Sequence, residues 1–436
     1  MANETIGLLG LISLLLMILV HVPIGVAMGI SGVVTFGILR NFSAAFSVVG
    51  SEATSALAST DLALIPLFIL MGNFASGGGM ARDIYRLAAS FVGHLRGGLA
   101  MATIGGCAGF GAISGSSIAT VTTMTKVSFG EMTARGYAQT LAGGSIAAGG
   151  TLGMLVPPSI VFVLYAVLTE KFVLTLFAAA LVPAALAVIL HFIAIQIYLL
   201  RRPKDGLPAD RVNWRGRLSA LQGAWTSILL VTVVAGGIYS GIFTVTESAA
   251  VGAILALSIA VIRGEMTRET FWNALHDTAA TSAMIYLIYV GATVFGYAMT
   301  LSLLPEMLVE FIGGLNMSPL AIIALLMVLY IIMGAIFDTI SAMVLTMPFV
   351  YPVILQLGYD PIWWGVIMIV VCEIGMITPP IGINVLVMNA MLPQVSLKTI
   401  FTGIVPFLCA DLVRLTLLVL LPVLSLWLPE LLGLPR

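Results

Sequence analysis

Long apolar stretches, separated by short polar or basic segments, follow one another along nearly the whole chain. Several of them carry no charged side chain over about 20 residues, which is the length that a helix needs to cross a bilayer. The pattern predicts an all-α polytopic membrane protein. Uninterrupted spans are expected at residues 5–20, 23–39, 62–76, 172–200, 220–240, 245–262, 281–302 and 399–428.

Two shorter segments are apolar on one helical face only. In residues 81–96 the apolar positions begin at Ile84 and recur every three or four residues, and the same spacing begins again at Leu304, 220 residues later. Helices with one apolar face can lie in the plane of the membrane. We therefore predict two in-plane arm helices, at 81–96 and 303–315. The first arm is basic and the second is acidic.

The middle of the chain contains one unit twice. When the sequence is shifted by 223 positions, residues 111–124 align with 334–347, and seven of the 14 positions are identical. A shift of 222 aligns residues 153–158 with 375–380, so that both copies end in a Pro-Pro pair. Apolar segments that are interrupted at corresponding places in two halves mark the binding site of many secondary transporters.

The first interrupted segment is predicted to be a re-entrant hairpin at 97–127. Residues 97–125 carry no charge, yet basic residues stand on both sides, among them Arg96 and Lys126. Positive charge marks the cytoplasmic side, so a single crossing would place one of these groups on the wrong side. A hairpin that enters and leaves by the same face avoids this, with its turn at the small residues 111–117. Non-helical backbone is tolerated there if it faces protein or a water-filled cavity.

The second copy is predicted to be inserted upside down. Residues 269–397 contain no Lys or Arg, so every positive charge that flanks the first hairpin is missing from the second copy. Its hairpin, at 318–353, is expected to open toward the outside. In contrast, residues 201–217 hold six basic side chains and form a solvated cytoplasmic loop.

The resulting organisation has scaffold spans and two inverted repeats. Pro157-Pro158 and Pro379-Pro380 break the spans that follow the two hairpins. The predicted order is N-terminal scaffold spans (1–60, with 41–60 at an interface), a first repeat (61–200), the basic loop (201–217), further scaffold spans (218–280), the second repeat (281–428) and a C-terminal tail (429–436).

The hairpin tips and the broken spans are expected to meet near the midplane of the bilayer. Carbonyl ends of broken helices suit Na⁺ and their amide ends suit an anionic group, and hydroxyl and carbonyl oxygens are hard ligands for a hard cation. The candidate Na⁺ ligands are Ser114, Gly115, Ser117, Thr120, Gly153, Pro157, Gly334, Asp338, Gly375, Thr378, Pro379 and Gly382. The candidate substrate-binding residues are Ser114, Ser116, Ser117, Ser159, Asp338, Thr339 and Asn384.

Asp338 is the candidate with the most direct physical argument. An ionisable residue inside a span is by default a functional hypothesis, for substrate, proton or Na⁺, although it can also be a structural hydrogen-bond acceptor at the tip. The serines and threonines have a structural alternative too, because such side chains often bond their own helix or allow close packing. Weaker candidates are Glu247, Glu373 and the lone histidines His21, His191 and His276.

Several other function classes find no support in the sequence. There is no phosphate-binding loop and no Cys or His spacing typical of a metal site. The three cysteines lie in apolar segments, and nothing in the sequence indicates a nucleic-acid partner. The predicted binding region holds no Lys or Arg, so an anionic substrate would be held by helix N-termini and bound cations. Substrate and Na⁺ would then favour each other's binding, because linkage is reciprocal.

Several of these motifs together resemble one known family. Leu70-Met71-Gly72-Asn73 and the runs at 109–120, 153–159, 334–338 and 377–382 are similar to those of the large membrane subunit of tripartite ATP-independent periplasmic (TRAP) transporters. The resemblance implies a fold similar to that of the divalent-anion/Na⁺ symporters and an elevator mechanism. It also implies Na⁺-driven uptake of a small organic acid across the bacterial inner membrane.

The resemblance implies partners as well. A periplasmic substrate-binding protein would deliver the organic acid, and a small four-helix membrane subunit, here expected as a separate chain, would brace the scaffold in the lipid bilayer. Relatives that carry sialic acid use an arginine near the start of the second arm, which this chain lacks. Dicarboxylates, oxo acids and other small acids remain open.

Two rival readings lead to different experiments. The first is a one-component Na⁺ or H⁺ symporter of the same fold that needs no binding protein. The second is an intramembrane serine protease, and it is disfavoured because Ser114 and Ser116 have no histidine in a matching motif to act as base. We therefore expect a transporter subunit and not an enzyme.

Overall fold

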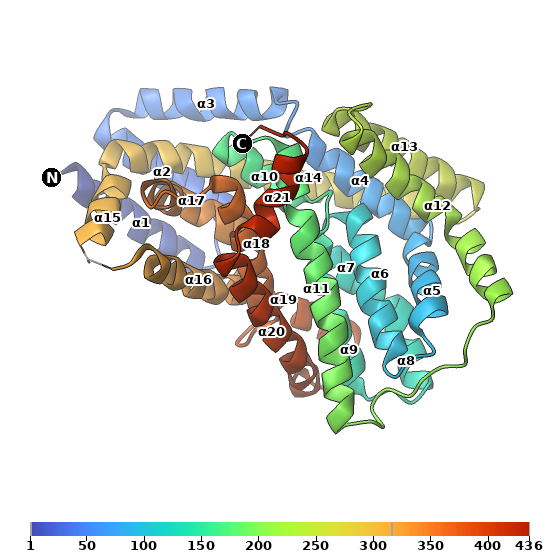
Figure 1. Cartoon of the computed structure of the whole chain (residues 1–436). Helices are drawn as coiled ribbons and strands as arrows, with labels where there is room; N and C mark the ends of the chain where they lie inside the picture. The colour runs from blue at the N-terminus through green and yellow to red at the C-terminus, as the bar shows by residue number, and fades with distance from the viewer. Residues whose placement is uncertain (1, 315–316, 436) are drawn as a thin grey trace.

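The computed structural model describes residues 2–314 and 317–435, and within these ranges all the regular structure is helical. Figure 1 shows the helices in chain order from blue to red. Seven of the described helices are long and apolar enough to cross a membrane, or up to nine if two bent pairs each count as one span. The molecule is an all-α polytopic membrane protein.

The first repeat contains an arm, a hairpin and a broken span. The arm bends away from the span before it by 68°. The elements are α4 (Leu64–Gly77), the arm α5 (Met80–Val92), the hairpin α6 (Gly98–Ser114) and α7 (Ser117–Met124), a π-helical turn (Thr125–Phe129), α8 (Gly130–Ala134), the broken span α9 (Gln139–Leu155) and α10 (Ile160–Thr169), and α11 (Val173–Arg201).

The second repeat has the same order of elements. It begins with α14 (Arg268–Ser302), which is longer than the predicted span 281–302 because the helix already starts at the Thr267 cap. The arm α15 (Leu304–Gly314) follows, and position 315 of the predicted arm lies outside the described residues. Then come the hairpin α16 (Pro319–Ile336) and α17 (Thr339–Gln356), the broken span α18 (Pro361–Ile377) and α19 (Ile383–Met391), and α20 (Leu397–Leu420).

The remaining helices frame the two repeats. They are α1 (Asn3–Leu19), α2 (Ile24–Leu39), α3 (Phe42–Ala58), α12 (Trp214–Tyr239) and α13 (Val245–Ile262). Helix α2 packs closely on α14 because Gly25 and Gly32 leave no room for a side chain, since an added Cβ would come within 2.8 Å and 2.7 Å of the α14 backbone. Helix α3 lies across the upper edge of Figure 1.

The predicted last span, 399–428, is wrong as a single helix. Helix α20 ends at Leu420, and α21 (Val423–Leu431) follows as a separate helix packed near α11. The cause is Pro422, which has no backbone N–H and disfavours helical backbone at the preceding Leu421. Leu421 accordingly has φ −127° and ψ 72°.

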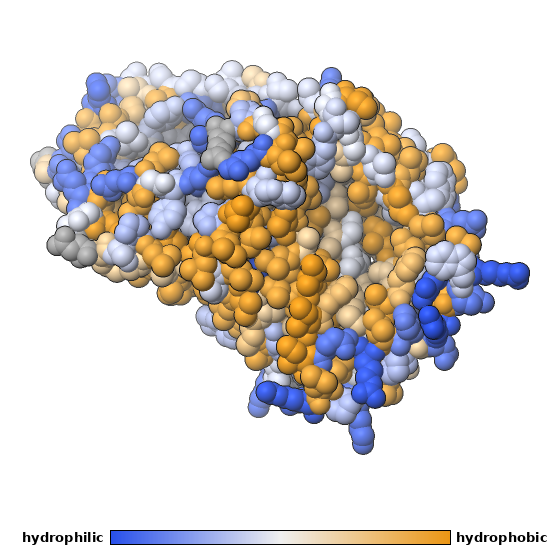
Figure 2. Space-filling view, viewed as in Figure 1, coloured by the Kyte–Doolittle hydropathy of each residue, from blue (hydrophilic) through white to orange (hydrophobic). Residues whose placement is uncertain are grey.

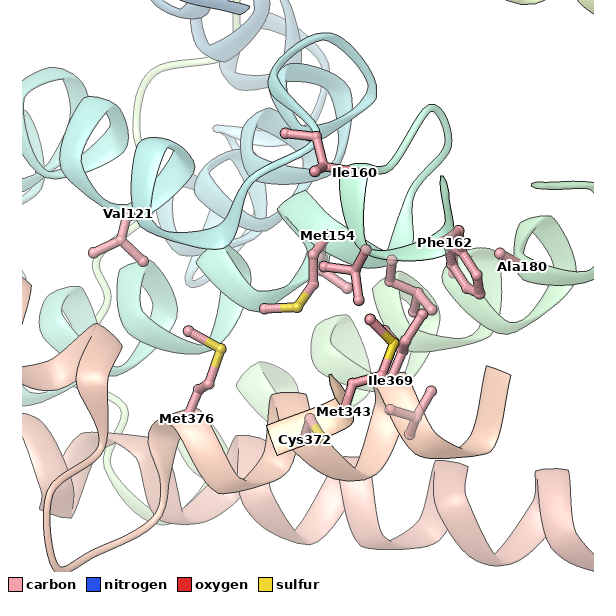
Figure 3. Packing of buried hydrophobic residues seen from close by; sticks show 14 of the residues in the cluster. Val121, Met154, Ile160, Phe162, Ala180, Met343, Ile369, Cys372 and Met376 are labelled. Atoms are coloured by element: carbon pink, nitrogen blue, oxygen red, sulfur yellow. The ribbon is translucent and has the colours of Figure 1, made fainter. Parts of the chain in front are cut away.

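The two repeats pack on each other through reciprocal helix contacts. Helix α7 of the first hairpin packs on α19 of the second broken span, and α17 of the second hairpin packs on α10 of the first. In the same way α9 packs on α20, and α18 packs on α11. Because each contact has its counterpart with the repeats exchanged, the two repeats are related by an approximate two-fold axis, which is the relation expected of an inverted pair. Their shared core contains Met154 of α9 and Met376 of α18, which Figure 3 shows on facing sides of the apolar cluster.

Glycines set the distance between hairpin and broken span in both repeats. A Cβ on Gly111 would lie 2.7 Å from the Cα of Gly153, and a Cβ on Gly375 would lie 2.7 Å from the Cα of Gly334. Real Cβ contacts are not this short, so each pair of helices touches backbone to backbone. The same glycine contact therefore occurs at corresponding places in the two halves.

Candidate functional site

Each hairpin turns at a capped helix start. Helix α6 ends at Gly115, whose φ of +60° favours glycine, and α7 begins after Ser116, whose hydroxyl accepts a hydrogen bond from the amide of Ala119. In the second hairpin Asp338 is the cap of α17 and accepts hydrogen bonds from both the amide and the hydroxyl of Ser341. Ser and Asp are favoured at this position because their oxygens satisfy free helix amides.

The repeat register changes by one residue at the hairpin tips. Gly111 and Gly334 make equivalent contacts and are 223 positions apart, whereas the capping residues Ser116 and Asp338 are 222 apart. The caps are therefore offset by one residue from the alignment at 223, although four of its identical positions lie beyond the tip. The second hairpin has one residue fewer between its glycine contact and the cap of its second helix.

Both spans break at a Pro-Pro pair next to the hairpin of the same repeat. The Pro157-Pro158 and Pro379-Pro380 bonds are cis. In the second repeat the amide of Gly382 donates to the carbonyl of Ala335 at 3.3 Å, which ties the break to the hairpin. In the first repeat a Cβ on Gly115 would lie 3.0 Å from the carbonyl oxygen of Pro158. Helix carbonyl ends and polar hairpin residues thus meet at two equivalent places.

The first of these places gathers hydroxyls and carbonyls. The hydroxyls of Ser114 and Thr120 lie 3.0 Å apart, and Thr120 donates to the carbonyl of Ser116 at 2.8 Å. Gly153 faces Thr120 closely, since its added Cβ would come within 2.3 Å of the Thr120 hydroxyl oxygen. The candidate ligands Ser114, Gly115, Thr120, Gly153 and Pro157 therefore lie around one hairpin tip and one helix break.

At the second place the two candidate threonines make separate contacts. Thr378 donates to the carbonyl of Ile374 at 2.6 Å within its own helix, and the hydroxyl of Thr339 lies 3.3 Å from the sulfur of Met376. Gly334, Gly375, Pro379 and Gly382 supply backbone at this break, and Asp338 caps the hairpin beside it. Asp338 is half-buried, so its carboxylate is not enclosed in the apolar core.

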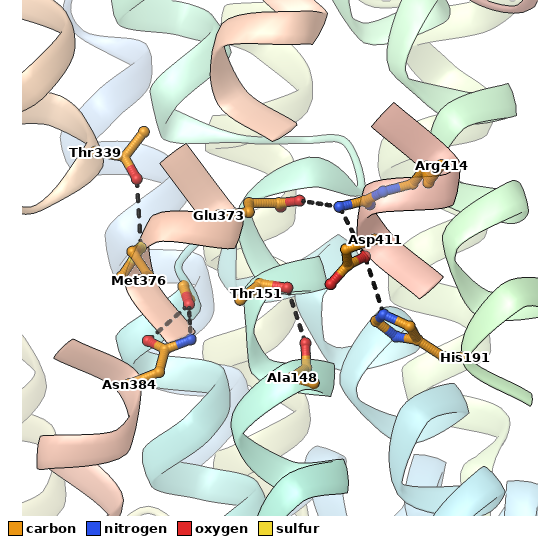
Figure 4. A network of polar contacts seen from close by, with 10 residues as sticks. Ala148, Thr151, His191, Thr339, Glu373, Met376, Asn384, Asp411 and Arg414 are labelled. Carbon is orange, nitrogen blue, oxygen red and sulfur yellow. Dashed lines mark hydrogen bonds and ion pairs between the residues drawn. The ribbon is translucent and has the colours of Figure 1, made fainter. Parts of the chain in front are cut away.

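One pair of side chains joins the two repeats directly. The hydroxyl of Ser117, at the start of α7, lies 2.8 Å from Nδ2 and 3.0 Å from Oδ1 of Asn384 on α19. The Asn384 amide also donates to the carbonyl of Ala147 at 3.3 Å. Both side chains are buried, and Figure 4 shows the contact near Met376. A tip of one repeat and a break of the other thus share a polar contact.

Ser159 is placed differently from the other candidates. Its side chain is fully buried, and its hydroxyl donates to the carbonyl of Met154 at 2.5 Å across the Pro-Pro break. This bond satisfies a carbonyl that the interrupted helix would otherwise leave unpaired. The structure therefore gives Ser159 a local role at the break.

Comparison with known proteins decides the family. Residues 11–424 match the family model described as "Tripartite ATP-independent periplasmic transporter, DctM component". The chain belongs to this family. The DctM component is a transporter subunit, and the long apolar helices agree with a multi-pass protein of the bacterial inner membrane. Membership implies a small membrane subunit and a periplasmic binding protein as partners.

Several curated relatives cover almost the whole chain. The C4-dicarboxylate TRAP transporter large permease protein DctM of Vibrio cholerae is 34% identical, over 95% of this chain and 96% of the relative. The sialic acid TRAP transporter large permease protein SiaM of the same organism is 29% identical, over 99% of both chains. The isethionate TRAP transporter permease protein DctMQ of Oleidesulfovibrio alaskensis is 34% identical over 87% of this chain, which spans 60% of that longer protein.

A solved structure shows the same fold. The Alcanivorax borkumensis YdaH transporter superposes with a TM-score of 0.63 over 86% of this chain and 87% of the other. The two sequences are only 15% identical, so the likeness concerns the fold alone. The helix–break–helix hairpins and broken spans of this TRAP permease are thus part of an architecture found in a distant transporter.

This TRAP permease also has a buried charged cluster that the sequence analysis missed. Asp411 accepts from Nε2 of His191 at 3.0 Å and from Nη2 of Arg414 at 3.1 Å, and Arg414 also donates to Glu373 at 3.1 Å. All four side chains are buried and join α11, α18 and α20 (Figure 4). The signal was available, because Asp411 and Arg414 are two charges one helical turn apart inside an apolar span.

The cluster corrects two sequence inferences. First, His191 is not a lone histidine, because it contacts Asp411. Second, the region of the second break does have a cation nearby. Arg414 binds Glu373, which precedes Gly375 by two residues on α18. Arg414 is nevertheless held by two carboxylates. The other weak candidates lie apart. Glu247 and Thr244 form a capping box, and His276 is exposed beside Asp277.

Proposed function

We propose that this TRAP permease imports a small organic acid anion together with Na⁺, as the large subunit of a tripartite secondary transporter. A periplasmic binding protein would deliver the anion, and a separate small four-helix subunit would complete the membrane part. The observation that carries this proposal is the Ser117–Asn384 contact, because it joins a hairpin tip of one repeat to a helix break of the other. Family membership supports the tripartite assembly.

Na⁺ is proposed to bind at the two places where a hairpin tip meets a break. The carbonyl ends of α6 and α9 and the hydroxyls of Ser114 and Thr120 supply the oxygen ligands that Na⁺ prefers. In the second repeat the ligands would be backbone carbonyls around Gly334 and Gly375, with Asp338 and Thr378. The N-termini of α7 and α19 meet at the Ser117–Asn384 contact and would attract the substrate's negative charge.

Coupling would follow from charge balance. The anion would enter a region where helix amides and bound Na⁺ provide the positive charge, while Arg414 is engaged by Asp411 and Glu373. An anion placed beside empty cation sites would be less favourable, and so would cations without the anion. Each would therefore raise the affinity for the other by the same factor.

Movement would take the form of an elevator. The hairpins, the broken spans, α11 and α20 pack on one another across both repeats, which supports their motion as one body. Helices α2 and α14 are joined through glycine contacts and would form part of the fixed scaffold. Helix α4 packs on α14 and would belong to the scaffold too. It touches the moving part at Gly72, where an added Cβ would lie 2.9 Å from the Ser114 Cα.

The proposed substrate class is that of small organic acids, including C4-dicarboxylates. Relatives bear names for C4-dicarboxylate, isethionate, sialic acid and 2,3-diketo-L-gulonate transport, all of which are anions. The second arm, Leu304–Gly314, contains no arginine. This disfavours sialic acid if an arginine near the start of that arm is what recognises it.

The test is uptake of labelled organic acids into proteoliposomes that contain this chain and its small partner. An inward Na⁺ gradient is applied with and without the cognate binding protein, and K⁺ replaces Na⁺ in the control. We expect uptake of one acid, or of a closely related group, only when Na⁺ and the binding protein are both present. Equal uptake in K⁺ would contradict Na⁺ coupling. Na⁺-driven uptake without the binding protein would favour the one-component symporter instead.

A further inference from the structure

A groove runs along the outer surface between α11 and α20, away from the hairpins. Its volume is about 620 Å³. One wall is a helical stripe of α11 that includes Ile193 and Ile197, and the other is a stripe of α20 that includes Val405 and Cys409. These four side chains are exposed, whereas Ala410 is buried at the base of the groove. The walls are thus apolar surface that faces the lipid.

One end of the groove is basic. Arg201 and Arg202 lie there with Tyr198 and Thr402, and the Arg202 guanidinium is 5.7 Å from the centre of the Tyr198 ring. In the described part of the chain, neither arginine forms an ion pair with a carboxylate. The nearby Asp205 accepts a hydrogen bond from the Tyr198 hydroxyl at 2.5 Å. Figure 2 shows hydrophilic side chains at the lower end of both helices, with apolar surface above them.

The length of the groove matches one leaflet of a bilayer. On α11 its lining residues run from Arg201 back to Leu190, and on α20 they run from Thr402 to Val413. Each stretch covers 12 residues, and the 11 steps between its first and last residue span about 16 Å at 1.5 Å per residue. Half of a hydrocarbon core is about 15 Å thick. A transmembrane helix of a partner would need a contact about twice as long.

We infer that this groove binds one anionic phospholipid of the leaflet that contains the basic loop. An acyl chain would lie along the apolar stripes, and the phosphate would lie between Arg201 and Arg202. The start of α20 lies at the same end, so Lys398 adds positive charge there. The helix dipole of α20 is opposed at this end by that of α11, which ends at Arg201, so the charge comes from the side chains. A basic cluster directly beside an apolar membrane surface is the arrangement that attracts anionic lipids.

The site would make the permease sensitive to lipid composition. Helices α11 and α20 directly follow the two broken spans, and the His191–Asp411 contact joins them. A lipid bound between the outer faces of α11 and α20 would help the His191–Asp411 contact to hold the two helices together. The inference depends on neither the identity of the transported acid nor Na⁺ coupling, so it can fail while the proposed function stands.

Cys409 provides a direct probe of the groove. It is exposed, whereas Cys107 and Cys372 are buried, so a small thiol-reactive fluorophore such as bimane will react at Cys409. The labelled full-length chain is placed in nanodiscs of phosphatidylcholine that contain increasing fractions of dibrominated phosphatidylglycerol. Bromine quenches the fluorophore on contact. Dibrominated phosphatidylcholine in parallel nanodiscs gives the binding constant of the phosphatidylglycerol relative to a zwitterionic lipid.

We expect the wild-type protein to prefer phosphatidylglycerol by up to about thirtyfold, because each of two arginines near a membrane surface contributes about 1 kcal/mol. Arg201→Gln with Arg202→Gln should lower the preference to about one, and both side chains are exposed, so folding should not change. The matched control is Arg211→Gln with Arg215→Gln, which removes the same charge from two exposed positions outside the groove, before and at the start of α12, and should keep the preference.

A second readout avoids the label. Native mass spectrometry of unlabelled protein from phosphatidylglycerol nanodiscs should show one more retained lipid in the wild type than in the Arg201/Arg202 double variant. Ala410→Leu, which fills the base of the groove, should lose that lipid with both arginines in place. Equal quenching by the two lipids in the wild type would overturn the inference. An equal loss of preference in the Arg211/Arg215 control would also overturn it. So would native mass spectra in which every variant retains as many lipids as the wild type.

Discussion

Ser117 and Asn384 are 267 residues apart in sequence, and their side chains lie within 3.0 Å of each other inside the protein. Ser117 stands at the start of α7, next to the first hairpin tip. Asn384 stands at the start of α19, next to the second Pro-Pro break. Two interrupted helices from opposite repeats therefore present their N-terminal ends to one place, and an anionic substrate group would be attracted there.

Replacing Asn384 should remove transport more than stability. Asn384→Ala is expected to lower the initial rate of uptake at limiting substrate at least tenfold, because it removes an amide shared by both repeats. The matched control is Asn389→Ala on the same helix, whose amide donates to the carbonyl of Val395. Uptake by the Asn389 variant should stay within about twofold of wild type. Wild-type uptake by Asn384→Ala would exclude this residue from the site.

At Asp338 the role of the negative charge can be tested separately from the role of the helix cap. Asparagine is as good a cap as aspartate, whereas alanine costs about 1 kcal/mol. If the carboxylate serves Na⁺ or substrate, Asp338→Asn should keep the melting temperature and lose uptake, and Asp338→Ala should lose both. If Asp338 is only a cap, Asp338→Asn should transport normally.

Ser116 is the equivalent cap in the first repeat and has no charge. Ser116→Ala is expected to lose transport while the protein still inserts, because its α7 amide end would no longer be fixed. Ser116→Asn serves as the control, since it keeps a capping oxygen. Membrane fractionation reports insertion and proteoliposome uptake reports function. Normal uptake by Ser116→Ala would exclude a role for this cap.

The glycine contacts should be intolerant of a single methyl group. Gly375→Ala would place its Cβ 2.7 Å from the backbone of Gly334, and Gly153→Ala would place its Cβ 2.6 Å from the carbonyl oxygen of Ser116. Backbone cannot yield as a flexible side chain can, so each change should cost about 1–3 kcal/mol and abolish uptake. Thermal unfolding in detergent measures the loss.

Gly130→Ala is the control for these variants. Gly130 is helical, and a Cβ added there meets nothing within 4 Å. Alanine is the better helix former, so stability should be equal or slightly higher. If the Gly153 and Gly375 variants behaved like Gly130→Ala, the close helix contacts described here would be contradicted.

Removing one member of the buried charged cluster should strongly destabilise the folded protein. Arg414→Met would leave Glu373 and Asp411 buried without their cation, which typically costs about 3–5 kcal/mol. Arg135→Met breaks an exposed pair with Glu131 and should cost less than about 1 kcal/mol. Thermal unfolding of the two variants should therefore differ clearly. A similar small shift in both would show that the cluster is not desolvated as described.

The sequence predicted the repeated architecture well because its signals were local. Missing charge and basic flanks placed the hairpins, and paired prolines placed the broken spans. The structure puts the first tip at Gly115, within the predicted 111–117. The one-residue offset between the two helix caps was not visible, because the identical residues continue at the shift of 223 past the tip. Only the capping bonds of Ser116 and Asp338 reveal it.

The contacts between distant segments could not be predicted from sequence. Nothing in the chain indicates that Ser117 meets Asn384, or that His191 meets Asp411, since 220 residues or more lie between the partners. Asp411 and Arg414 were detectable as two charges one turn apart in an apolar span. They lie outside the repeated breaks, so the repeat itself did not point to them.

The most direct test of the account measures Na⁺ and substrate entry in the same proteoliposomes. Radioactive Na⁺ and a labelled organic acid are supplied together to vesicles that hold this chain and its small partner, with the binding protein outside. The account predicts that Na⁺ enters in step with the acid, that omitting either stops the entry of the other, and that Asn384→Ala abolishes both. Substrate entry that continues at the same rate without any Na⁺ entry would contradict it.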